Sequence, residues 1–194
     1  EIEVATNTRI FFDLVGFNVQ TGEKITNNGY FKISNSDDSS STLKTSVSII
    51  NKNNLEIDNI SITQTTDDSA IVNESKLKLT DSLVQGKNGY GISNTGNGTI
   101  ELDEETTITS TNNYGLYNSS QNFRLTNGTV YGIYNSGSMI IDENSKITMH
   151  LMENTQNRAN AIYNNGTITM NNGSITFNQG IDAILNNGNF IIND

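Results

Sequence analysis

A short motif recurs along almost the whole chain and constrains its fold more than any other feature. It consists of an aliphatic residue, one variable residue and an asparagine, followed after a short turn by two apolar residues separated by one position. The clearest copies are AIYNNGTITM at 161–170 and AILNNGNFII at 183–192. Eight copies align, and their first residues advance from Ile25 to Ile184 in steps of about 23 residues. Such a period is typical of solenoids, in which each repeat buries its apolar face against its neighbours.

Within each copy the apolar residues alternate with other residues, which is the pattern of a β-strand. The turn between the two apolar pairs is rich in Asn and Gly, which tolerate the positive φ that we expect at a sharp corner. A third apolar pair follows in most copies, as at Ile60 and Ile62. Three short strands per repeat, without any helix-length segment, predict an all-β fold: a right-handed parallel β-helix of about eight coils over residues 21–194. The copies are Ile25-Asn27-Phe31-Ile33, Ile49-Asn51-Leu55-Ile57, Ile71-Asn73-Leu77-Leu79, Ile92-Asn94-Ile100-Leu102, Leu116-Asn118-Phe123-Leu125, Ile133-Asn135-Met139-Ile141, Ile162-Asn164-Ile168-Met170 and Ile184-Asn186-Phe190-Ile192.

The asparagine of each copy points the same way as the aliphatic residue two positions earlier, which is into the core. A buried amide is costly unless it is hydrogen-bonded. Because parallel strands stack at about 4.8 Å, each amide can bond to the amides above and below it. We therefore predict an internal asparagine ladder with an architectural role, made of Asn27, Asn51, Asn73, Asn94, Asn118, Asn135, Asn164 and Asn186.

Some segments fall outside the repeat. Residues 1–20 carry several apolar side chains and are expected to cap the N-terminal edge of the stack, which would otherwise favour aggregation. The stretches 34–42 and 150–160 are expected to be loops that project from the coils. The chain stops at Asp194 directly after an apolar pair, so we expect the solenoid to continue beyond it.

Composition excludes several classes of function. The net charge of −10 argues against a nucleic-acid partner, because phosphate binding needs a basic surface. The absence of Cys rules out disulfides and cysteine metal sites, and no cofactor or metal site is predicted. No run approaches the roughly 18 apolar residues of a membrane-spanning helix. The opening EIEVATNTRIFF has neither the basic start nor the apolar stretch of a signal peptide, so an export signal would lie outside this chain.

Acidic residues follow the second strand of several copies and raise the alternative of an enzyme. Asp58, Asp81, Asp103 and Asp142 are expected to form an outward column, one coil apart. Many β-helices cleave acidic polysaccharides with clustered carboxylates and Lys or Arg, or with carboxylates that hold Ca²⁺. We prefer a role in turn capping and solubility for this column, and we keep a polysaccharide lyase or hydrolase as the alternative.

A second outward column lies between the inward anchor and the inward asparagine of the later copies. It contains Tyr117, Tyr134, Tyr163 and Leu185, with small Gly or Ala neighbours. An exposed aromatic stripe is suited to recognition of a protein or glycan. The same residues can instead form a packing ladder between coils or a face covered by a loop. Both interpretations stay open from the sequence.

The GIYNSG, AIYNNG and ILNNG turns, the TITM and SITF strands and the Asn-rich, Cys-free composition resemble the passenger domains of type V autotransporters. The resemblance covers nearly the whole chain and is strongest to the large fusobacterial outer-membrane adhesins. It implies type V secretion and display on the surface of a Gram-negative bacterium. It also implies a non-enzymatic adhesin and virulence factor that contacts proteins or glycans of host cells or partner bacteria. We expect a monomeric, rigid stalk that presents its outward side chains and loops.

Overall fold

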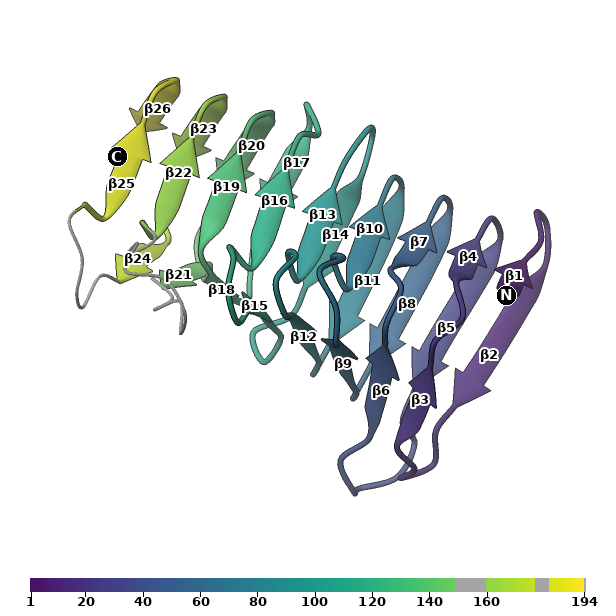
Figure 1. The fold of residues 1–194 in the computed structure, drawn as a ribbon. Helices are drawn as coiled ribbons and strands as arrows, with labels where there is room; N and C mark the ends of the chain where they lie inside the picture. Colours follow the sequence, from purple (N-terminus) through teal and green to yellow (C-terminus); the bar gives the residue numbers. More distant parts are fainter. Residues whose placement is uncertain (149–159, 177–181, 194) are drawn as a thin grey trace.

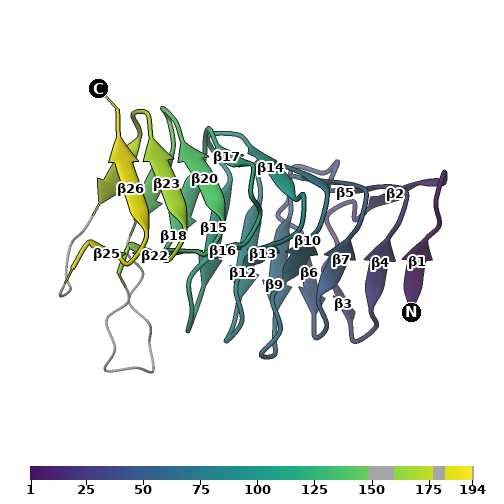
Figure 2. The same ribbon diagram turned by 90° about the horizontal axis from the view of Figure 1, so that it is seen from above.

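The strands stack as successive coils of a parallel β-solenoid (Figures 1 and 2). The computed structural model describes residues 1–148, 160–176 and 182–193. Within these residues, eight coils contribute three strands each, and a ninth contributes two. The described chain contains no helix, so the predicted all-β parallel solenoid of about eight coils is confirmed.

The first strands of all coils form one continuous parallel sheet. Equivalent residues of neighbouring coils face each other, so that Asn73 pairs with Asn51 on one side and Asn94 on the other. This register places each ladder position directly above the previous one. The strands are β1 (Ile2–Val4), β4 (Ile25–Asn27), β7 (Ile49–Asn51), β10 (Ile71–Asn73), β13 (Ile92–Asn94), β16 (Leu116–Asn118), β19 (Ile133–Asn135), β22 (Ile162–Asn164) and β25 (Ile184–Asn186).

The second strands form two parallel sheets that follow one another along the stack. The interruption falls between the fourth and fifth motif copies, where the turns from Asn94 to Ile100 and from Asn118 to Phe123 are longer than in the other copies. The strands of the first sheet are β2 (Arg9–Asp13), β5 (Tyr30–Ser34), β8 (Asn54–Asp58), β11 (Lys76–Thr80) and β14 (Thr99–Leu102). Those of the second are β17 (Phe123–Leu125), β20 (Ser138–Ile141), β23 (Thr167–Met170) and β26 (Asn189–Ile192).

The third strands close each coil and form a further parallel sheet. They are β3 (Val19–Thr21), β6 (Thr42–Thr45), β9 (Ser61–Gln64), β12 (Leu83–Gly86), β15 (Thr107–Ser110), β18 (Thr129–Tyr131), β21 (Lys146–Thr148) and β24 (Ser174–Thr176). The core runs along the axis between the three faces, and each coil adds aliphatic side chains to it, as Ile71, Leu77 and Val84 do. Burying a side chain of this kind stabilises a fold by about 1.5–3 kcal/mol relative to leaving it exposed.

Residues 1–20, which were expected to form a cap, instead build a coil of the same kind. Strand β1 pairs with β4, with Ile2 opposite Ile25 and Val4 opposite Asn27, while β2 and β3 pair with β5 and β6. The motif did not reveal this coil because Val4 stands where the later coils have asparagine. Its outer edge leaves the inward-facing Ile2 45% and Phe12 38% exposed, so the apolar N-terminal end remains open in the described structure.

The first corner of a coil is the turn between its first and second strands, and its glycine has a different role from the one predicted. Neither Asn165 nor Gly166 is among the described residues with positive φ, so this copy of the corner does not need a left-handed residue. Asn7 and Gly96 do have positive φ at the first corner of other coils. A Cβ on Gly166 would lie 2.0 Å from the carbonyl oxygen of Gly137 in the preceding coil. Glycine is therefore required by the close approach of two backbones. Positive φ occurs at the second corner, at residues such as Asn59 and Asp81.

This packing predicts a large difference between two glycine substitutions. Gly166→Ala forces its methyl group against backbone and should lower the free energy of unfolding by about 1–3 kcal/mol. Gly22→Ala is the matched control, because its Cβ would meet no atom closer than the Ser46 hydroxyl at 3.4 Å. It should change stability by less than about 0.5 kcal/mol. Chemical denaturation of both variants measures the contrast, and equal losses would contradict the steric explanation.

Candidate functional site

The ladder asparagines are joined in one continuous chain of side-chain hydrogen bonds. The Nδ2 of each donates to the Oδ1 of the next, at 2.7–3.0 Å, from Asn27 to Asn186. All of them except Asn186 are completely buried. The backbone fixes the orientation of each amide: the Gly166 N–H donates to the Asn164 Oδ1 at 3.1 Å, while the Asn164 Nδ2 also donates to the Asn189 carbonyl at 2.9 Å. The ladder thus serves architecture and presents no group to a ligand.

Removing one amide should have very different effects inside and at the end of the ladder. Asn94→Ala takes one hydrogen bond each from the buried Asn73 amide, the buried Asn118 oxygen and the Gly98 carbonyl, which should lower the free energy of unfolding by about 2–5 kcal/mol. Asn186→Ala removes one ladder bond at an exposed position and should cost about 1 kcal/mol or less. Denaturant titrations test this, and comparable losses in the two variants would contradict it.

The predicted tyrosine column is present on the outer face of β16, β19 and β22. Tyr117 lies opposite Tyr134, Tyr134 opposite Tyr163, and Tyr163 opposite Leu185. The ring centroids of Tyr134 and Tyr163 are 4.9 Å apart with an interplanar angle of 16°, and those of Tyr117 and Tyr134 are 5.4 Å apart. Leu185 extends the column and is 38% exposed.

Two further tyrosines, which the sequence analysis missed, join this column from the corners that precede β13 and β16. The Tyr90 ring stacks on Tyr117 at 5.1 Å, and the Tyr114 ring meets Tyr134 edge-on at 6.0 Å. Both stand directly before the glycine that precedes the aliphatic anchor, and this recurring Tyr-Gly pair is the signal that could have revealed them. We call Tyr90, Tyr114, Tyr117, Tyr134 and Tyr163 the tyrosine cluster.

The hydroxyls of the outward column bond to the turn of the following coil. The Tyr117 hydroxyl lies 3.1 Å from the Ser136 hydroxyl. The Asn165 amide donates to the Tyr134 hydroxyl at 3.1 Å, and the Asn187 amide donates to the Tyr163 hydroxyl at 3.3 Å. The five tyrosines of the cluster are half-buried, and the Tyr90–Tyr117 and Tyr134–Tyr163 pairs are stacked. These contacts favour packing between coils as one role of the cluster, and recognition stays a prediction.

Burial sets the acidity of the inner members of the cluster. It raises the pKa of Tyr90, and it raises the pKa of Tyr114 to about 12. A hydrogen bond with the backbone of Asn160 acts in the opposite direction on Tyr114, and neighbouring tyrosines add to the rise. Tyr114 is therefore held in its neutral form by the low-polarity surroundings of the cluster.

The raised pKa of Tyr114 predicts a loss of stability at high pH. Tyrosines of the unfolded chain ionise near pH 10, whereas Tyr114 keeps its proton to about pH 12. The unfolded state therefore binds fewer protons in this window, so the free energy of unfolding falls as pH rises from about 10 to about 12. Tyr114→Phe should reduce this slope in denaturant titrations across the pH range, and an unchanged slope would contradict the assignment.

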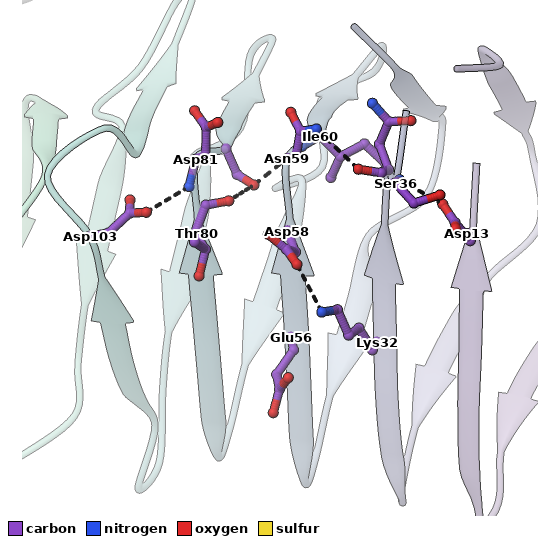
Figure 3. Close-up of polar contacts among 12 residues, drawn as sticks. Asp13, Lys32, Ser36, Glu56, Asp58, Asn59, Ile60, Thr80, Asp81 and Asp103 are labelled. Carbon is purple, nitrogen blue, oxygen red and sulfur yellow. Dashed lines mark hydrogen bonds and ion pairs between the residues drawn. The ribbon is translucent and has the colours of Figure 1, made fainter. Parts of the chain in front are cut away.

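The acidic column predicted one coil apart is not formed as such, because Asp58 lies opposite Thr80 and Asp81 stands one position later. The carboxylates instead form caps and ion pairs at the second corner, between the second and third strands of a coil (Figure 3). Asp103 accepts the backbone N–H of Asp81 at 2.8 Å and that of Thr106 at 3.0 Å. Asp58 forms an ion pair with Lys32 at 2.8 Å, next to the same corner. These carboxylates thus satisfy local donors.

Asp142, the last carboxylate of that column, lies largely buried in a polar corner groove. It forms an ion pair with the Arg124 guanidinium and accepts a hydrogen bond from the Asn171 amide at 3.1 Å. The groove has a volume of about 490 Å³ and is also lined by Asn127, Asn172 and their neighbours. Within the described residues, no group of three or more acidic, His or Cys side chains is placed to hold a metal ion.

One cluster on the outer face of β5 and β8 comes nearest to the arrangement that an enzyme would need. Lys32 pairs with Asp58 and also lies in the field of Glu56, whose carboxylate accepts the Tyr30 hydroxyl at 2.8 Å. The hydrogen bond that Lys32 donates to Asp58 raises the pKa of Lys32, and burial raises the pKa of Tyr30. Both groups therefore hold their protons at neutral pH and are poor general bases.

The two expected loops differ in what is described. The first, between β5 and β6, packs against the equivalent turn of the first coil, because the Asn35 oxygen accepts the Gly16 N–H at 2.8 Å. The buried Asn35 amide also donates to the carbonyls of Asp37, at 2.9 Å, and of Ser39 within the loop. The second, 150–160, lies outside the described residues except for Asn160.

No family model, curated protein or solved structure matches the chain. In the part of the chain that the structure describes, no helix has the length and apolar character needed to cross a membrane.

Proposed function

We propose that this chain is a non-enzymatic adhesin segment of the type V autotransporter kind, displayed on the surface of a Gram-negative bacterium. Its partner is a protein or glycan of a host cell or a neighbouring bacterium. The observation that carries the proposal is the tyrosine cluster, an aromatic surface built on consecutive coils of a rigid stack.

The stack supplies the reach that such a function needs. Nine coils at a spacing of about 4.8 Å extend over about 38 Å, and every interface from the second coil onward carries a ladder hydrogen bond. A solenoid of this kind holds its outer side chains in fixed positions, since each coil is bonded to both neighbours. Recognition groups on it are therefore organised before a partner arrives, which lowers the entropic cost of binding.

The tyrosine cluster supplies the recognition surface. Tyrosine edges combine apolar area with a polar hydroxyl, a combination that is enriched at protein interfaces. The column continues into the partly exposed Leu185, and the turn amides of Asn165 and Asn187 border it. Stacking covers one ring face of each member in the Tyr90–Tyr117 and Tyr134–Tyr163 pairs, so the proposal favours a protein partner over a sugar stacked on a ring face.

A polysaccharide lyase or hydrolase is the second candidate. It is favoured by one observation, the position of Lys32 beside Asp58 and Glu56. Incubation of the purified chain with acidic polysaccharides tests it, with chain length and unsaturated or reducing ends as readouts. We expect no turnover, and turnover that is lost in Lys32→Ala would replace the adhesin proposal with the enzyme.

Cell binding tests the adhesin proposal. Tyr134→Ser combined with Tyr163→Ser should weaken binding of the labelled chain to host cells or partner bacteria at least about tenfold, since central aromatic residues dominate interfaces. The matched control, Thr107→Ser with Thr109→Ser, alters outward residues of the third face. Circular dichroism before binding verifies that both variants keep the β-fold. Wild-type binding that the double tyrosine variant retains would contradict the recognition role.

A further inference from the structure

Asn-Gly pairs recur at the corners of the solenoid, and the structure divides them into two chemically different groups. At the first corner, Asn28, Asn165 and Asn187 precede glycines whose N–H groups are held by the ladder. At the second corner, Asn127 and Asn172 precede glycines that have no such partner among the described residues. We propose that Asn127 and Asn172 are sites of spontaneous deamidation, and that the ladder protects the first-corner asparagines from the same reaction.

The reaction is intramolecular and needs only water. The backbone nitrogen of the glycine attacks the Cγ of the preceding asparagine, so that an N–Cγ bond forms and the Cγ–Nδ2 bond breaks. The departing Nδ2 group takes the proton of the glycine N–H and leaves as ammonia, which gives a cyclic succinimide. Water then opens either C–N bond of the imide and gives aspartate or isoaspartate. The attacking atom is the glycine nitrogen, so any hydrogen bond that holds its N–H suppresses the first step.

The first corner holds both reacting groups. The Gly166 N–H donates to the Asn164 Oδ1 at 3.1 Å, which keeps the nucleophile turned into the core. The side chain of Asn165 is held as well, because its amide donates to the Tyr134 hydroxyl and its oxygen accepts the Asn187 amide, both at 3.1 Å. Attack at Asn165 therefore requires several hydrogen bonds to break together.

The same protection occurs at the two ends of the ladder. The Gly188 N–H donates to the Asn186 Oδ1 at 3.3 Å, and the Asn187 amide is bonded to Tyr163 and Asn165. The Gly29 N–H donates to the Asn27 Oδ1 at 3.1 Å, and the Asn28 amide is bonded to Glu3 at 3.0 Å. These three first-corner pairs are thus held on both sides of the reaction.

The second corner holds neither group. Asn172 and Gly173 both lie in an exposed turn with positive φ at each residue. Gly128 likewise has a φ of 80°, but it is buried and follows the half-buried Asn127. No described hydrogen bond engages the side chains of Asn127 or Asn172, or the N–H groups of the glycines that follow them. The nucleophile and the amide are therefore free to approach each other.

The two remaining Asn-Gly pairs fall between these extremes. The Gly98 N–H donates to the Thr95 carbonyl at 2.9 Å, while no described hydrogen bond holds the Asn97 side chain. The Asn88 side chain is bonded to Asp67 at 2.5 Å and to Asn112 at 2.6 Å. In each pair a hydrogen bond holds only one of the two reacting groups, so we expect deamidation rates between those of the other two groups of pairs.

Deamidation at the second corner would change the polar groove around Asp142. Asn127 and Asn172 both line the groove that contains the Arg124–Asp142 ion pair. Two new carboxylates there would change the net charge of the chain from −10 to −12 and would compete with Asp142 for the single guanidinium in the groove lining. The chemistry thus converts a neutral amide surface into an acidic one as the displayed protein ages.

The experiment is a time course of the intact folded chain at mildly alkaline pH, with peptide mass spectrometry to locate amide-to-carboxylate conversion. Asn172 and Asn127 should convert about tenfold or more faster than Asn165 and Asn187, because each hydrogen bond that must open first lowers the reactive population several-fold. Asn172→Gln is the blocking control and should abolish conversion at that position only. Equal rates at both corners, or faster conversion at Asn165, would overturn the proposal.

A ladder variant tests the protective role directly. Asn164→Val replaces the acceptor of the Gly166 N–H with the residue type found at this position in the first coil, Val4. Conversion at Asn165 should then rise severalfold, with Asn172 in the same sample as the internal reference. Tyr134→Phe releases only the Asn165 amide and gives a smaller rise in a chain with an intact ladder. If neither variant changes the rate at Asn165, protection by these contacts is refuted.

Discussion

The structure depends on a row of buried amides that bond only to their own kind and to the nearby backbone. Each ladder asparagine has its side-chain oxygen and nitrogen satisfied when the neighbouring coil is in register, and it loses those partners when the coil slips by one residue. Hydrophobic burial alone would tolerate several alignments of similar strands. The amides therefore make the in-register stack strongly preferred over its competitors, since an unpaired buried amide costs about 1–3 kcal/mol.

The outer surface repeats the order that the ladder imposes inside. Once equivalent residues lie above one another, any side chain that occurs in successive coils meets its own copy. Tyr134 and Tyr163 stack for this reason, and the turn asparagines Asn165 and Asn187 bond to each other. The acidic residues of the second corner likewise meet the backbone donors of the neighbouring coil, as Asp103 meets the Asp81 N–H. The aromatic and amide columns are thus consequences of one register.

Much of this could be predicted from the sequence because a ladder residue must recur at the same place in every coil. The spacing of the asparagines and aliphatic anchors predicted the parallel solenoid and the direction in which each side chain points. The first coil was not predicted, because Val4 occupies the ladder position and the motif requires an asparagine there. The contacts of Tyr90 and Tyr114 with the column were not predicted, because both residues lie before the strand and outside its alternating pattern. The steric requirement for glycine at position 166 could not be predicted either, since it arises from backbone of the neighbouring coil.

The central claim is that the buried asparagines bond to one another along the stack. Nuclear magnetic resonance can detect this directly, through couplings across the hydrogen bond from the Nδ2 of one asparagine to the Cγ of the next. The account predicts such couplings between consecutive ladder residues from Asn27 to Asn164, with side-chain amide protons that exchange slowly with solvent. Rapidly exchanging amides without couplings between coils would contradict it.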